Sequence, residues 1–106
     1  MSLIKRVLES SDKIQNGRDV YHPFIWAKGE MDELCEELVK KTSDREPGPD
    51  GIMGEAIDVI QCMIDVIRLT YPEFTHEELI EQMTSRMATK CDKWESKYAT
   101  AESISG

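Results

Sequence analysis

The stretch that most constrains the fold of this chain runs from Gly51 to Arg68 and reads GIMGEAIDVIQCMIDVIR. Its composition predicts one α-helix that is apolar on nearly every side, and such a helix is normally buried within a domain. The segment nevertheless carries three carboxylates, Glu55, Asp58 and Asp65. A buried carboxylate is costly unless it is paired or binds a metal. The central helix therefore predicts a polar site inside a helical protein.

A second group of acidic residues lies upstream, in the segment GEMDELCEEL. Glu30, Glu33 and Glu37 follow an i, i+3, i+7 spacing, which places them on one face of a helix. Taken alone, this stripe is more typical of a solvated helix face. Glu55 and Asp58 share a face in the same way, on a helix with little polar surface. Carboxylates from two adjacent helices predict an oxygen-only metal site suited to Mg²⁺ or Mn²⁺.

Apolar spacing and turn residues predict an all-α fold, a bundle of three to four helices. The expected helices are Leu3–Gln15, Phe24–Lys41, Ile52–Thr70 and His76–Tyr98. Tyr21-His22-Pro23 is expected to be a connector, because the residue before proline avoids helical geometry. Prolines and glycines predict a mobile loop at 43–51, and residues 99–106 are expected to be a frayed tail. The length of 106 residues favours a single domain, residues 1–106.

Charge and cysteine content narrow the class of protein. A net charge of −8 argues against binding a nucleic acid polymer or an anionic membrane. The three cysteines include no CxxC pair, so we expect reduced thiols in a cytoplasmic protein. No apolar run is long enough to cross a membrane, and Met1–Glu9 lacks the apolar core of a signal peptide.

The last predicted helix carries a basic stripe with i, i+4, i+7, i+11 spacing: Arg86, Lys90, Lys93 and Lys97. A solvated surface and a phosphate-binding surface are both open interpretations of this stripe. Beside two acidic helices, the lysines would suit a ligand that combines a metal with a polyphosphate. Trp26 and Trp94 are expected in the core or an interface rather than stacked on a base.

The order of these features resembles the MazG-like branch of the all-α nucleoside triphosphate pyrophosphohydrolases. That family has an ExxE helix, a variable loop and an ExxD helix. Here Glu30-Met-Asp-Glu33, followed by Leu34, is similar to the first element. Glu55-Ala-Ile-Asp58 is similar to the second element.

The resemblance covers about Trp26 to Tyr98, with Glu33-Leu-Cys-Glu36 as an alternative register for the first motif. It implies Mg²⁺-dependent cleavage of a nucleoside triphosphate to the monophosphate and pyrophosphate. The implied metal ligands are Glu30, Glu33, Glu55 and Asp58. Glu33 or Glu37 would take the proton of the attacking water. Lys90, Lys93 and Lys97 occupy the region that contacts phosphates in the family.

Two further classes of function compete with a nucleotide hydrolase. A small acidic helical protein is also suited to be a non-catalytic interaction or dimerisation module. An enzyme of the same fold acting on a phosphoribosyl metabolite is the other alternative. The resemblance and the all-round apolar central helix both predict a homodimer, with a homotetramer as the larger option.

Overall fold

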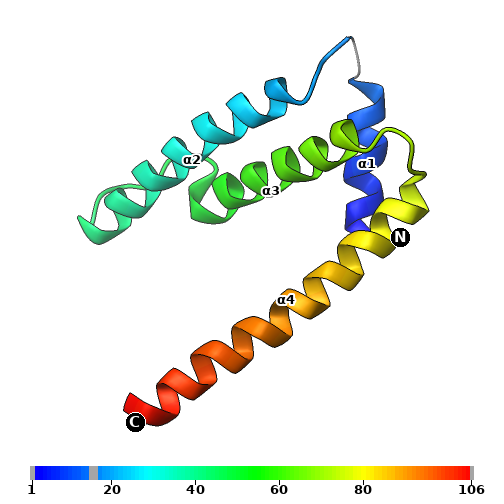
Figure 1. The fold of residues 1–106 in the computed structure, drawn as a ribbon. Helices are drawn as coiled ribbons and strands as arrows, with labels where there is room; N and C mark the ends of the chain where they lie inside the picture. Colours follow the sequence, from blue (N-terminus) through cyan, green and yellow to red (C-terminus); the bar gives the residue numbers. More distant parts are fainter. Residues whose placement is uncertain (1, 15–16, 106) are drawn as a thin grey trace. The chain divides into compact units, whose positions relative to one another are not determined.

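The computed structural model describes residues 2–14 and 17–105, and from residue 99 it describes the backbone only. This part contains four helices and no strand (Figure 1). They are α1 (Leu3–Lys13), α2 (Tyr21–Thr42), α3 (Gly51–Thr70) and α4 (His76–Ser105). The all-α class is thus confirmed. No described helix combines the length and apolar character that a membrane crossing requires.

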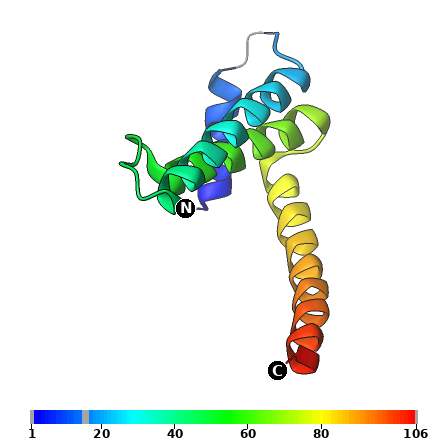
Figure 2. The same cartoon turned by 90° about the vertical axis from the view of Figure 1, so that its left-hand side faces the viewer.

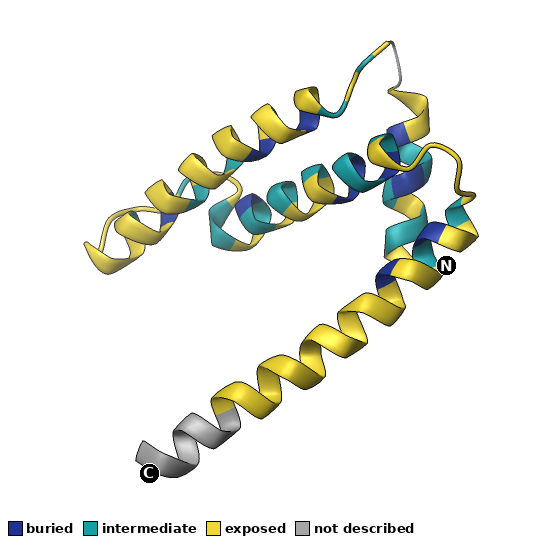
Figure 3. Ribbon diagram, in the orientation of Figure 1, coloured by how far each residue is buried: buried dark blue, intermediate teal, exposed yellow. Residues whose placement is uncertain are grey.

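The chain divides into two compact units, Met1–Glu73 and Phe74–Gly106. In the first unit α2 and α3 form an antiparallel pair, and α1 packs against α3 (Figures 1 and 2). Buried positions of α2 fall on its side toward α3, as Figure 3 shows. The second unit is α4 with the residues before it. A single domain over residues 1–106 stays a prediction.

The start of α2 differs from the prediction. The helix begins at Tyr21 rather than Phe24, so the expected connector at Tyr21–Pro23 is wrong. Pro23 lies in the first helical turn, where a missing N–H costs no intrahelical hydrogen bond. The carboxylate of Asp19 accepts a hydrogen bond from the Tyr21 N–H at 3.0 Å.

The ends of α1 and α4 also differ from expectation. α4 continues to Ser105, beyond the predicted end at Tyr98, and so includes most of the expected tail. Residues 99–105 contain neither glycine nor proline, so no strong stop signal interrupts the helix. α1 ends at Lys13, and the predicted end at Gln15 lies outside the described residues.

The loop between α2 and α3 is tied back to α2 by a side chain as well as by backbone hydrogen bonds, such as that from the Arg45 N–H to the Lys40 carbonyl at 2.8 Å. The Gly48 N–H donates to the two carboxylate oxygens of Glu37, at 2.8 and 3.2 Å. Lys40 Nζ lies 3.5 Å from the same carboxylate. A Cβ added at Gly48 would lie only 2.3 Å from Glu37 Oε1, so any other residue there would force the Glu37 carboxylate to shift. Glu37 is therefore buried with its charge compensated.

A buried ion-pair network fixes α1 against α3. Asp65 accepts hydrogen bonds from the Ser11 hydroxyl and the Arg18 guanidinium. Arg68 donates to the Ser11 hydroxyl and pairs with Asp12 at 3.1 Å. Burial alone would raise the pKa of Asp65, but the hydrogen bonds from Arg18 and Ser11 and the charges of both arginines outweigh it. The pKa of Asp65 is therefore held below its usual range.

Candidate metal centre and adjoining cavity

Three of the predicted metal ligands come together between α2 and α3. Glu30, Glu55 and Asp58 each offer a carboxylate oxygen, and these oxygens all lie within 4.8 Å of one another. Two helical features produce this geometry. The spacing of three residues places Glu55 and Asp58 on one face of α3, and the antiparallel partner α2 brings Glu30 to the same place.

Two oxygens of this cluster are buried without a hydrogen-bond partner. They are Oε2 of Glu30 and Oε2 of Glu55. Glu55 as a whole is only 8% exposed. A buried carboxylate oxygen without a partner is destabilising, because it has lost its hydration without compensation. A bound cation or a bound proton would supply the missing partner.

The electrostatics of the cluster favour protonation in the absence of a cation. Burial, a hydrogen bond to Glu33 and the charges of Glu33, Asp58 and Glu55 raise the pKa of Glu30 from 4.5 to about 7. Burial and the same interactions with Glu33, with charge from Asp50 and Asp58, raise the pKa of Glu55. Glu33 is itself exposed, but it interacts with both Glu30 and Glu55. The fourth predicted ligand therefore lies beside the other three.

We expect the metal-free protein to become less stable as the pH rises through this range. Between pH 4.5 and about 7, folded Glu30 keeps a proton that the unfolded chain has released, so the free energy of unfolding falls. Urea unfolding in EDTA at several pH values measures this slope. Glu30→Gln should flatten it, whereas the matched change Glu36→Gln, at an exposed position on α2, should not. Equal slopes for wild type and Glu30→Gln would contradict the prediction.

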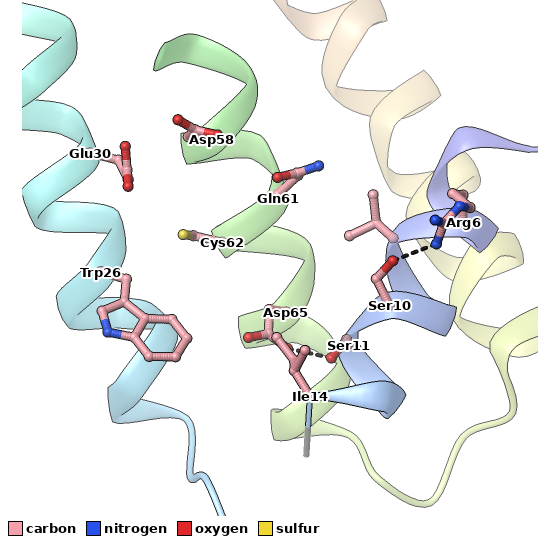
Figure 4. Close-up of a pocket in the computed structure, with 11 residues that line it drawn as sticks. Arg6, Ser10, Ser11, Ile14, Trp26, Glu30, Asp58, Gln61, Cys62 and Asp65 are labelled. Carbon is pink, nitrogen blue, oxygen red and sulfur yellow. Dashed lines mark hydrogen bonds between the residues drawn. The ribbon is translucent and has the colours of Figure 1, made fainter. Parts of the chain in front are cut away.

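A cavity of about 560 Å³ adjoins the carboxylate cluster. Figure 4 shows Glu30 on α2 and Asp58 on α3 at one side of it, with Arg6 and Ser10 of α1 at the other. Trp26 also lines the cavity. All three helices of the first unit thus contribute to its walls.

The remaining predicted site residues are not among the three carboxylates that converge. The Glu37 carboxylate is engaged by Gly48 and Lys40 and is not one of the three that converge. Its role as a catalytic base stays a prediction. Lys90, Lys93 and Lys97 are exposed on α4, in the second unit. Their contact with phosphates also stays a prediction.

Sequence reasoning missed the contribution of α1. Arg6 and Ser10 are one helical turn apart, and Arg6 Nη1 donates to Ser10 Oγ at 2.6 Å. Their i, i+4 spacing was a usable signal for this bond, but nothing in it indicated a cavity. Asp65 was identified as a costly buried carboxylate, whereas its partners Arg18 and Arg68 were not.

Comparisons with protein-family models, with curated proteins and with solved structures found no match for this chain. The fold and the site by themselves define an all-α protein with an acidic candidate metal centre beside a cavity. Any more specific assignment depends on the chemistry of these residues.

Proposed function

We propose that this protein is a Mg²⁺-dependent hydrolase that cleaves NTP or dNTP to a nucleoside monophosphate and pyrophosphate. The observation that carries the proposal is the cluster of Glu30, Glu55 and Asp58, whose oxygens lie within 4.8 Å of one another. An oxygen-only ligand set with unpartnered buried oxygens suits Mg²⁺, with Mn²⁺ as an alternative. The order of the two acidic motifs, which resembles MazG-like enzymes, supports the choice of substrate.

The carboxylates have two roles in this proposal: metal binding and acceptance of a proton. Glu30, Glu55 and Asp58 would hold the cation, which when bound polarises the α-phosphate and lowers the pKa of a water molecule. Glu33, exposed beside Glu30 and Glu55, would accept the proton of the attacking water. Glu37 is the alternative base. Attack of the water oxygen on the α-phosphorus breaks the bond to the β-phosphate oxygen, and pyrophosphate leaves.

A product assay tests the proposed reaction. The full chain with Mg²⁺ and a panel of NTPs and dNTPs should release pyrophosphate and the monophosphate in equal amounts. EDTA should stop the release, because without a cation the negatively charged carboxylates repel the phosphates. A phosphoribosyl pyrophosphate compound in the same panel tests the alternative substrate class. Release of orthophosphate, or turnover that survives EDTA, would be inconsistent with the proposal.

The basic stripe on α4 yields a separate prediction. Replacing Lys90 and Lys93 with methionine should raise the Kd for a non-hydrolysable nucleotide by about tenfold, since charge-assisted contacts at exposed positions are lost. The free energy of unfolding should change by less than about 0.5 kcal/mol at such surface sites. Titration calorimetry measures the affinity, and Lys13→Met on α1 is the matched control. Unchanged affinity would identify the stripe as solvated surface.

We also propose that the chain assembles as a homodimer at least, with a homotetramer as the larger option. Met53, Ile57 and Ile60 on α3 are 77%, 46% and 56% exposed. They share one helical face, and an apolar helix face left in water favours association. Light scattering after size exclusion measures the mass. An active monomer of 12.1 kDa would exclude the assembly.

The same apolar face is what an interaction module would present. Such a module has no need of the converging carboxylates, so its self-association should be indifferent to Mg²⁺. Thermal unfolding with and without Mg²⁺ and a non-hydrolysable nucleotide separates the two functions. A hydrolase should be stabilised by the pair of ligands, whereas the module should not respond.

A further inference from the structure

We infer that the cavity between α1, α2 and α3 holds the base of the nucleotide, and that Arg6 selects bases that carry a carbonyl oxygen, rather than an amino group, at purine C6 or pyrimidine C4. The inference rests on the proposed function and names the substrate preference of the same site. It assigns to α1 a role in specificity.

The position of the cavity fixes which part of a nucleotide it would receive. Glu30 and Asp58 belong both to the carboxylate cluster and to the cavity wall. A substrate whose phosphates lie at the cluster would therefore extend its sugar and base into the adjoining space. A volume of about 560 Å³ falls within the range of roughly 300–1,000 Å³ that small-molecule sites occupy.

Trp26 gives the cavity an aromatic wall. The indole is 47% exposed, so it is not a core residue, and Figure 4 shows it beside the space between α2 and α3. The Arg18 guanidinium lies over its ring, 5.7 Å from the centroid, and Arg18 is itself paired with Asp65. The buried network thus positions the indole. A ring held in place offers a stacking surface that is open to any base.

Arg6 supplies the means to discriminate between bases. Among the described residues that line the cavity, it is the one cation. A guanidinium has donors and no acceptor, so it can bond to a carbonyl oxygen but not to an amino group. The bond to Ser10 Oγ at 2.6 Å restricts its orientation. Gln61 also lines the cavity, but its amide can turn to present either a donor or an acceptor.

The carboxylates of the cavity do not reverse this preference. Asp65 accepts hydrogen bonds from Ser11 and Arg18, which leaves it little capacity for a ligand. Glu30 and Asp58 belong to the proposed metal centre. With the cation bound, the acceptors that would otherwise attract an amino group would therefore be engaged.

Binding of free nucleosides in the presence of Mg²⁺ tests the inference apart from catalysis, because a nucleoside has no phosphate to cleave. The chain has two tryptophans, so Trp94→Phe leaves Trp26 as the sole indole N–H resonance in an NMR spectrum. Two pairs of nucleosides differ chiefly in a carbonyl oxygen against an amino group: inosine with adenosine, and uridine with cytidine. We expect inosine and uridine to bind about fivefold more tightly, toward the low end of discrimination by a bidentate arginine.

Variants of α1 test whether Arg6 is the residue that causes the base preference. Arg6→Ala in the Trp94→Phe background should bring the two members of each pair to equal affinity while the indole resonance still shifts. Lys13→Ala removes a positive charge from the same helix outside the cavity, and it should keep the preference. Equal affinities in the parent protein, or a preference that survives Arg6→Ala, would overturn the inference.

The outcome also separates this inference from the proposed hydrolase. Pyrophosphate release at equal rates from ITP and ATP, and from UTP and CTP, would overturn the base selection and leave the hydrolase standing. Selective nucleoside binding without any pyrophosphate release would overturn the hydrolase and leave the cavity assignment standing.

Discussion

Replacing Asp58 with alanine is expected to lower Mg²⁺-dependent pyrophosphate release by roughly a hundredfold or more. Even residues that only support metal ligands typically contribute about 10- to 100-fold to affinity or activity, and a direct ligand should contribute at least as much. Asp58 is one of three carboxylates whose oxygens lie within 4.8 Å of one another. Its loss would leave Glu30 and Glu55 as an incomplete ligand set. Initial rates at saturating Mg²⁺ measure the effect.

Stability measurements on the same variant separate a lost ligand from a lost fold. Without metal, Asp58→Ala should unfold at the same free energy as wild type or a higher one, because a carboxylate that repels Glu30 is gone. Mg²⁺ should no longer raise its melting temperature. Asp32→Ala, at an exposed position on α2, is the matched control and should keep both activity and the Mg²⁺ response. Full activity in the Asp58 variant would show that the cluster is not the metal centre.

The second large effect is expected from Asp65→Asn, which should lower the free energy of unfolding by about 3 kcal/mol. Breaking a buried ion pair costs roughly 3–5 kcal/mol, because the remaining charge stays buried without compensation. Here the Arg18 guanidinium would lose its carboxylate, and the charge on nearby Arg68 would lose a counter-charge. Urea unfolding at pH 7 measures the change.

The sign of the pH dependence gives this prediction a further test. The pKa of Asp65 is lowered in the folded protein, so its contribution is present above about pH 4 and is lost as the pH falls below that value. Wild type and Asp65→Asn should therefore converge in stability at acid pH. Asp12→Asn removes a half-exposed partner of Arg68 and should cost less than about 1 kcal/mol. Equal costs at Asp12 and Asp65 would refute the importance of the buried pair.

The helices of this protein were largely predictable because their apolar residues recur with the helical period. The strongest example is α3, predicted from Ile52 to Thr70 and observed from Gly51 to Thr70. The start of α2 was not predictable from the rule that the residue before proline avoids helical geometry. That rule is a preference and not a prohibition, and His22, which precedes Pro23, lies in the first turn of α2.

The carboxylate cluster followed from spacing, whereas its surroundings did not. Residues three apart on one helix must share a face, which is why Glu55 and Asp58 could be paired from the sequence. The partners of Asp65 could not be identified in this way, since Arg18 is 47 positions away in the chain. Periodicity reports which face a residue occupies and not which distant segment covers that face. The place of Arg6 at the cavity was unpredictable for the same reason.

The bond between Glu37 and Gly48 sets where the loop between α2 and α3 can change in length. Residues 46–47 precede this bond and follow the backbone hydrogen bond from Arg45 to Lys40, so added residues there can bulge into solvent at a small cost in loop entropy. Between Gly48 and the start of α3 at Gly51 only residues 49–50 are present, so an added residue there could not be accommodated in the same way. An insertion there would break the bond or displace the first turn of the helix that carries Glu55. Natural variation in the length of this loop should therefore accumulate on the amino-terminal side of Gly48.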